Sequence, residues 1–295
     1  MLKCNHIKRE TTNTRMILEE IMKNIWKKLL AVGLAAAIVA CVFAGCAQKN
    51  KNTGDNSAKS EGDTFTVGFD AEFPPYGYQD EKTGEYVGFD LDLAREVCKR
   101  NGWTFVAQPI DWDSKDGELN SGNIDCIWNG FTKAPNLLDK YTWSESYINN
   151  SIMIATLADS DIKSVDDLKG KVIASQSGSS AETAVKEDTE LMSNVKNYVS
   201  IGNYQDAYMQ LKAGAFDALF VDIGVAKTQD AKNPGTFKIL DDPYTAEEYA
   251  IGFKLGSEAL KDQVQTTLKE MVKDGTFAKI AEQYELSESV CLEAE

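Results

Sequence analysis

Polar side chains that could hold a small charged molecule follow two apolar stretches of the sequence. Asn129, Gly130 and Thr132 come just after one stretch, and Asp222 ends the other. A buried carboxylate without a partner is costly, so an Asp in this position needs a partner, and a cation would meet that need. That cation would be either a ligand or an internal Lys or Arg, and the sequence leaves both open.

Hydroxyl groups gather at the start of a predicted helix in the second half of the chain. An apolar strand predicted over 171–175 precedes Ser179 and Ser180, and a helix is predicted from about residue 181. N–H groups at a helix start are free to bind an anion. Serine is also an ordinary cap at this position, and the sequence does not separate the two interpretations.

The sequence lacks the residues that several kinds of catalysis need. The only histidine is His6, ahead of the part expected to fold. The body therefore cannot run a Ser-His-Asp or Cys-His mechanism or hold a His-ligated zinc ion. No phosphate loop of the G-x-x-x-x-G-K-[ST] type is present, so ATP hydrolysis is not expected. We expect no catalytic residue, no metal and no cofactor, although carboxylate catalysis stays open.

The charge balance argues against a nucleic-acid partner. The formal net charge is −15, and the first 45 residues are net basic, so the remainder is more acidic still. Such a surface repels phosphate backbones.

An internal repeat indicates two related α/β lobes. The stretches 119–128 and 211–220 both read L-x-x-G-x-apolar-D-x-apolar-apolar. This pattern is typical of a helix that ends at glycine, here Gly122 or Gly214, followed by a short buried strand. Open α/β sheets bind ligands just beyond the carboxyl ends of such strands.

Other elements fit the first lobe. Residues 65–69 alternate as a strand, and 78–86 predicts a hairpin. A helix is predicted from an N-cap at Asp90 to about Arg100, with Gly102 just beyond its end.

The amino terminus has the layout of a secretory signal. A basic segment over 22–28 precedes a short apolar core over 29–44, and small residues lead to Cys46. Cys46 would be lipidated and become the first mature residue, with Cys41 as a weaker candidate. An uncleaved amino-terminal anchor is the alternative, although the apolar core is short for a membrane span.

The predicted organisation follows from this leader. Residues 1–45 form the signal peptide, whose true start is Met22 or Met16, and 46–63 form a polar, flexible linker on a lipid anchor. The body is then extracytoplasmic and held at the cell membrane. The spacing of its cysteines suggests neither a metal site nor a bridge, and Cys98 and Cys126 are expected in the core.

Nine stretches, in this order, resemble the solute-binding proteins of bacterial polar amino-acid ABC importers (family 3). They are 67–70, 74–76, 87–94, 111–113, 122–132, 168–171, 178–180, 214–222 and 274–276. The resemblance implies a type II periplasmic-binding fold: two α/β lobes, a ligand cleft between them and a two-strand hinge. Lobe 1 would be 64–150 plus 249–290, and lobe 2 would be 151–248.

The resemblance also implies a set of ligand contacts. Phe73 would stack on the ligand and Trp112 would form the opposite wall, although both could also be core residues. Asp222 would pair with the ligand's α-ammonium. The remaining contacts would come from polar groups on both sides of the cleft: Asp70, Asn129, Gly130, Thr132, Ser179 and Ser180.

One departure concerns the ligand's carboxylate. Thr132 resembles the Ser or Thr that binds it, but the position where most relatives carry an arginine is Leu137. Lys133 could supply the missing cation, or remain a solvated loop lysine. Alternatively, the ligand lacks a free α-carboxylate, or the chain binds weakly or acts as a sensor.

The function implied is capture of a polar amino acid or close analogue by lobe closure, and delivery to an ABC permease driven by a separate ATPase. Relatives suggest a monomer. The alternatives are a sensor module and an enzyme of the cyclohexadienyl-dehydratase kind, and the missing arginine and histidines count against the enzyme.

Overall fold

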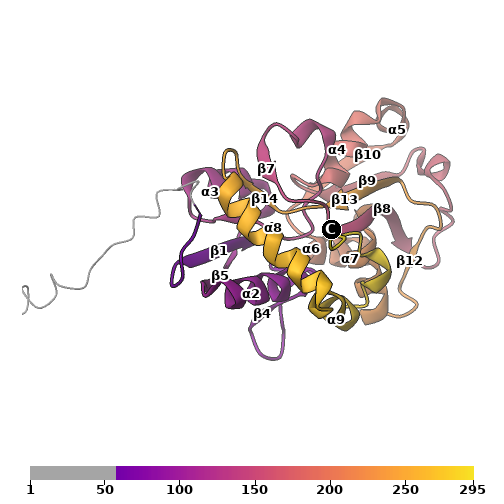
Figure 1. Cartoon of the computed structure of the whole chain (residues 1–295). Helices are drawn as coiled ribbons and strands as arrows, with labels where there is room; N and C mark the ends of the chain where they lie inside the picture. The colour runs from indigo at the N-terminus through magenta and orange to yellow at the C-terminus, as the bar shows by residue number, and fades with distance from the viewer. Residues whose placement is uncertain (1–57) are drawn as a thin grey trace, which may run out of the picture. The chain divides into compact units, whose positions relative to one another are not determined.

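The computed structural model describes residues 58–295 (Figure 1). The predicted signal peptide, Cys46 and the linker up to residue 57 lie outside the described residues. Lys59 already contacts the body, because its backbone N–H donates to Gln263 Oε1 (2.8 Å) and its ammonium pairs with Asp125 (2.9 Å). Contact with the body therefore begins inside the stretch predicted as linker. Across residues 58–295, no helix combines the length and the apolarity that a bilayer crossing requires.

The first lobe is built on a mixed sheet. Its strands, in spatial order, are β5 (Thr104–Pro109), β1 (Thr64–Phe69), β6 (Cys126–Ile127), β14 (Gly252–Lys254) and β7 (Tyr141–Trp143). Strand β1 is parallel to β5 and β6, whereas β14 is antiparallel to β6 and β7. Three helices pack on this sheet: α2 (Phe89–Asn101), α3 (Lys115–Ser121) and α8 (Glu258–Lys273). Helix α9 (Thr276–Gln283) packs on α2 and α8. Figure 1 shows α8 running beside α2, so the carboxyl-terminal segment completes the lobe that the first strands begin.

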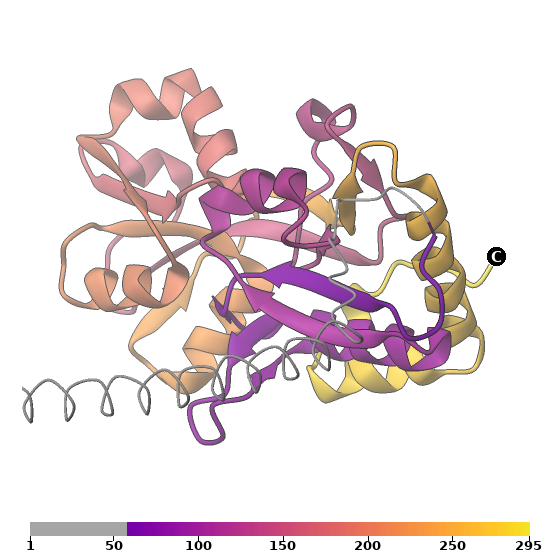
Figure 2. The ribbon, with the colours of Figure 1, turned by 90° about the vertical axis from the view of Figure 1, so that its left-hand side faces the viewer.

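The second lobe has its own sheet. Its strands, in spatial order, are β10 (Asn197–Ile201), β9 (Val172–Gln176), β11 (Ala218–Asp222), β8 (Ile148–Leu157) and β12 (Phe237–Ile239). Its helices are α4 (Ser180–Glu187), α5 (Thr189–Asn194), α6 (Tyr204–Lys212) and α7 (Ile223–Lys232). Figure 2 shows this segment, in pink and orange, gathered on one side of the first lobe.

Two antiparallel strands connect the lobes. Strand β8 leaves the first lobe, and β13 (Thr245–Tyr249) pairs with its first half, with Ile148 opposite Tyr249 and Ile152 opposite Thr245. The chain then enters β14 of the first sheet. A small separate sheet, β2 (Glu72–Phe73), β3 (Gly77–Gln79) and β4 (Tyr86–Val87), forms the predicted hairpin region.

The internal repeat is confirmed as two helix–turn–strand units. Gly122 caps α3 in the left-handed conformation (φ 78°) and is followed by β6. Gly214 has the same conformation (φ 74°) and is followed by β11, although helix α6 already ends at Lys212. A residue with a side chain rarely adopts this positive φ, so glycine occupies the turn between helix and strand in both units.

The predicted N-cap of the first helix is wrong. Helix α2 begins at Phe89, and its cap residue is Gly88 rather than Asp90. Asp90 has no exposed surface, and its carboxylate accepts hydrogen bonds from the Gly130 N–H (2.7 Å) and the Tyr147 hydroxyl (2.8 Å). The carboxylate therefore stabilises the loop after β6, and burial raises its pKa to about 7.

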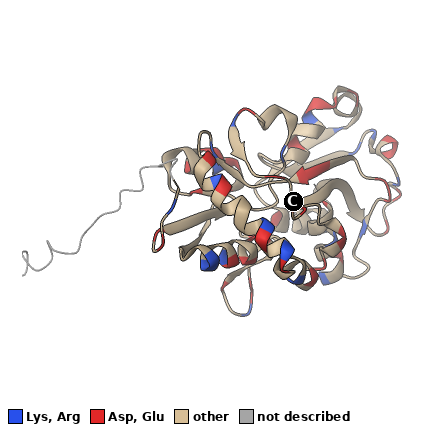
Figure 3. Cartoon of the chain, viewed as in Figure 1, with Lys and Arg blue, Asp and Glu red and all other residues tan. Residues whose placement is uncertain are grey.

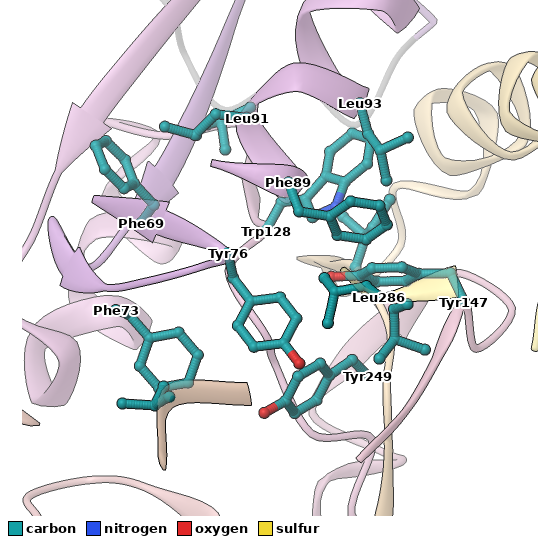
Figure 4. Close-up of a cluster of buried hydrophobic side chains, with 14 of the residues drawn as sticks. Phe69, Phe73, Tyr76, Phe89, Leu91, Leu93, Trp128, Tyr147, Tyr249 and Leu286 are labelled. Atoms are coloured by element: carbon teal, nitrogen blue, oxygen red, sulfur yellow. The ribbon is translucent and has the colours of Figure 1, made fainter. Parts of the chain in front are cut away.

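The largest hydrophobic cluster extends from one lobe to the other. Figure 4 shows Tyr76 between Phe73 and Tyr249, and the ring centroids are 5.6 and 5.1 Å apart. Cys98 and Cys126 are both buried free thiols, as predicted.

Candidate ligand-binding site

A cavity of about 650 Å³ lies between the lobes, with walls from both sheets and from β13. Most residues predicted to contact a ligand line it. They are Phe73, Trp112, Asn129, Gly130, Thr132, Ser179, Ser180 and Asp222, and Lys133 lines it too. The carboxyl ends of β6, β9 and β11 point their following loops into this space, which explains why residues so far apart in sequence meet here.

Aromatic side chains form part of the wall, but they are also packed. Phe73 is 5% exposed and its ring lies 5.8 Å from that of Tyr204, on the other lobe. Trp112 is 8% exposed and meets Phe131 edge to face at 5.6 Å. Both side chains therefore line the cavity with little exposed surface, and contacts with neighbouring rings hold them in place.

Asp70 does not line this cavity. Its carboxylate accepts from the Gln176 side chain (2.6 Å), which belongs to the other lobe, and from the Glu72 N–H (2.8 Å). Burial raises the pKa of Asp70. It borders a neighbouring hollow instead, and in this structure it joins the lobes.

The loop after β6 uses several of its polar groups internally. The Gly130 N–H donates to Asp90, and the Asn129 Oδ1 accepts from the Asp70 N–H (3.0 Å). Gly130 has φ 52°, and a Cβ there would lie 2.7 Å from Phe73 Cε1. Glycine is thus required both for the turn and for the approach of the aromatic ring.

The two serines differ in role. Ser179 is the N-cap of α4, because its hydroxyl accepts from the Glu182 N–H (3.0 Å) and donates to the Gln176 carbonyl (2.7 Å). The capping interpretation therefore describes its hydroxyl. The Ser180 hydroxyl instead faces the opposite lobe, where it lies 3.2 Å from the Thr132 hydroxyl.

Asp222 ends β11 and is 4% exposed. One carboxylate oxygen accepts from Asn150 Nδ2 (2.8 Å) and from the Tyr249 hydroxyl. Burial raises the pKa of Asp222. None of the ion pairs formed within residues 58–295 includes it, so an internal Lys or Arg is not its partner.

Glu247 is a site residue that sequence reasoning missed. It lies on β13, and its Oε1 accepts from Thr132 (2.8 Å), Asn150 (2.7 Å) and Ser180 (3.2 Å). Burial, with the nearby charge of Asp222, raises the pKa of Glu247 to about 7. The sequence did carry a signal for this residue, because two adjacent acids, Glu247 and Glu248, precede Tyr249 at the predicted lobe boundary.

The two lysines among the described residues of the cavity wall donate hydrogen bonds to backbone carbonyls. Lys133 Nζ donates to the Ser144 carbonyl (3.1 Å), and Leu137 packs in the cluster around Trp112. Lys115, also missed, is 8% exposed and crosses to the other lobe, where Nζ donates to the Gly178 carbonyl (2.9 Å). Burial lowers the pKa of Lys115. Within residues 58–295, no three His, Cys, Asp or Glu side chains are grouped as a metal site requires.

Known proteins resemble this chain over most of its length. Residues 65–287 match the family described as bacterial extracellular solute-binding proteins, family 3. The L-cystine-binding protein TcyA of Bacillus subtilis is 30% identical over 88% of this chain and 97% of its own length. The arginine-binding extracellular protein ArtP of the same organism is 30% identical over 88% of this chain and 98% of its own length.

Solved structures agree. An ancestral arginine-binding protein bound to arginine is 35% identical, with a TM-score of 0.71 over 75% of this chain and 97% of that one. A substrate-binding protein of an ABC uptake transporter from Streptococcus pneumoniae, with bound histidine, is 31% identical, with a TM-score of 0.72 over 75% and 92%. The two-lobed fold is that of type II periplasmic-binding proteins. The chain therefore belongs to the bacterial extracellular solute-binding proteins of family 3.

Proposed function

We propose that this protein captures a small solute that carries an ammonium group, a polar amino acid or a close analogue, and delivers it to an ABC permease driven by a separate ATPase. The observation that carries the proposal is the pair of carboxylates, Asp222 and Glu247, on the wall of a cavity between two lobes. A ligand cation would supply the positive charge that no Lys or Arg within residues 58–295 supplies to these two carboxylates.

Lobe closure is the proposed mechanism. Contacts from both lobes already meet across the cavity, at Thr132 with Ser180 and at Lys115 with Gly178. A ligand that touches both walls binds the closed form better than the open form, and so shifts the population toward closure. The strand pair β8 and β13 is the proposed hinge, because its strands carry the chain between the lobes.

The binding test is isothermal titration calorimetry on the full-length protein, unfolded and refolded to remove bound solute. The titrants are the twenty amino acids, cystine and a set of small amines. Saturable binding of one chemical class at micromolar concentrations is expected. An absence of heat from every titrant would contradict the proposal, and conversion of a titrant into product would favour an enzyme.

Attachment to the membrane is a separate part of the proposal. Lipidation of Cys46 would hold the body outside the cytoplasm on a lipid anchor. The proposed oligomeric state, a monomer, is independent of this anchor. Labelling of cells with palmitate should mark the wild-type protein, and Cys46→Ala should release it from the membrane fraction. A label that survives in Cys46→Ala would instead point to Cys41.

A further inference from the structure

The two hydroxyl groups best placed to hold a ligand carboxylate already hold one from the protein. Thr132 donates to Glu247 Oε1 at 2.8 Å from the first lobe, and Ser180 donates to the same oxygen at 3.2 Å from the second. Asn150 adds a third donor at 2.7 Å. An oxygen with three donors from both lobes occupies the place that a ligand carboxylate would take.

No arginine is among the described residues that line the cavity, so none of them offers a guanidinium to a second carboxylate. Leu137 packs against the Trp112 cluster, and its carbonyl accepts from Trp143 Nε1 (3.1 Å). The two lysines of the wall donate to backbone carbonyls, Lys133 to Ser144 and Lys115 to Gly178. A ligand carboxylate that bound to Thr132 would therefore lie beside Glu247 with no cation between the two. Two neighbouring negative charges repel each other.

The charged side chains of the cavity wall favour a cation over a carboxylate. Among the described residues that line the cavity are five carboxylates (Asp116, Glu187, Asp222, Glu247 and Glu248) and two lysines. Along the ribbon of the outer helices, in contrast, positions of acidic residues (red) and basic residues (blue) are interspersed (Figure 3). Asp222 and Glu247 are joined by a single amide, because Asn150 Nδ2 donates to both at 2.8 and 2.7 Å. Neither belongs to an ion pair within residues 58–295.

We propose that the ligand is a small organic cation, a primary amine or a guanidine, with no free carboxylate on the carbon that bears its ammonium group. Its ammonium would lie on the cavity side of the Asn150 amide that bridges Asp222 and Glu247, in reach of both carboxylates. This inference rests on the proposed function, capture of a solute in the same cavity, and narrows its chemical class. Glu247 acts as the specificity residue, because it both attracts the cation and excludes a ligand carboxylate.

Matched pairs of amino acid and decarboxylated amine test the proposal. The probes are lysine with cadaverine, ornithine with putrescine, arginine with agmatine and phenylalanine with phenethylamine, titrated by calorimetry into the refolded full-length protein. At least one amine should bind ten times more tightly than its parent amino acid. If amino acids bind within tenfold of their amines or more tightly, this inference is overturned while the proposed function stands. If neither class binds, both are wrong.

Variants separate the two effects of Glu247. Glu247→Gln keeps the shape and an acceptor oxygen, and should weaken binding of the best amine at least tenfold. The double change Leu137→Arg with Glu247→Gln should shift the preference at least tenfold toward the amino acid of the same pair. Glu81→Gln removes one charge from an exposed turn and is the matched control. Circular dichroism and a thermal melt confirm folding of each variant, and a folded double variant that keeps the wild-type preference overturns the proposal.

Discussion

Replacing Glu247 by Gln should stabilise the ligand-free protein at pH 8. The pKa of Glu247 rises from 4.5 to about 7 on folding, chiefly through burial. At about 1.4 kcal/mol per pKa unit, keeping this carboxylate ionised in the fold costs about 3 kcal/mol. Gln carries no charge, and its Oε1 can accept the same bonds from Thr132, Asn150 and Ser180. For a body of this size, about 3 kcal/mol corresponds to a gain in Tm of roughly 6–12 °C.

The effect of Glu247→Gln on stability should depend on pH. A raised carboxyl pKa stabilises the fold below the unfolded pKa of 4.5, and this contribution is lost as pH rises through about 7. The gain in Tm of Glu247→Gln over wild type should therefore be large at pH 8 and close to zero at pH 4.5. Differential scanning calorimetry of refolded wild type, Glu247→Gln and the Glu81→Gln control measures it. A gain that is the same at both pH values, or a loss at pH 8, would show that the ionised Glu247 carboxylate does not destabilise the fold.

Three further changes test other parts of the site. Asp222→Asn should weaken binding of the cationic ligand by about 2 kcal/mol or more, roughly 30-fold in Kd, measured by calorimetry; unchanged affinity would mean that the carboxylate has only a structural role. Asp90→Ala leaves the Gly130 N–H and the Tyr147 hydroxyl without their acceptor and should cost about 2–4 kcal/mol in urea unfolding, whereas a neutral result would show that water replaces the carboxylate. Gly130→Ala combines a positive φ with a Cβ too close to Phe73, so it should lower stability by about 1–3 kcal/mol and weaken ligand binding; binding equal to wild type would show that the ring does not contact the ligand.

Some of the fold can be inferred from local pattern because its causes are local. The repeat around Gly122 and Gly214 was predicted correctly, since a helix end that needs a positive φ shows itself as glycine in one short window. The end of α2 at Gly102 was predicted for the same reason. The start of that helix was predicted wrongly. Asp90 looks the same in the sequence whether its side chain caps its own helix or accepts hydrogen bonds from a distant loop.

Local patterns were enough to predict two α/β lobes, the polar residues at the strand ends and a body without histidine. How those residues are used depends on the way the lobes fold together. Ser179 caps a helix, Asp70 joins the lobes, and Glu247 receives the hydroxyls of Thr132 and Ser180. For Asp70 and Glu247 this is because their contacts across the site join residues more than 40 positions apart. Neither the distance between such residues nor the water excluded around a carboxylate is encoded in any local pattern, so the charge preference of the cavity appears only once the lobes are folded together.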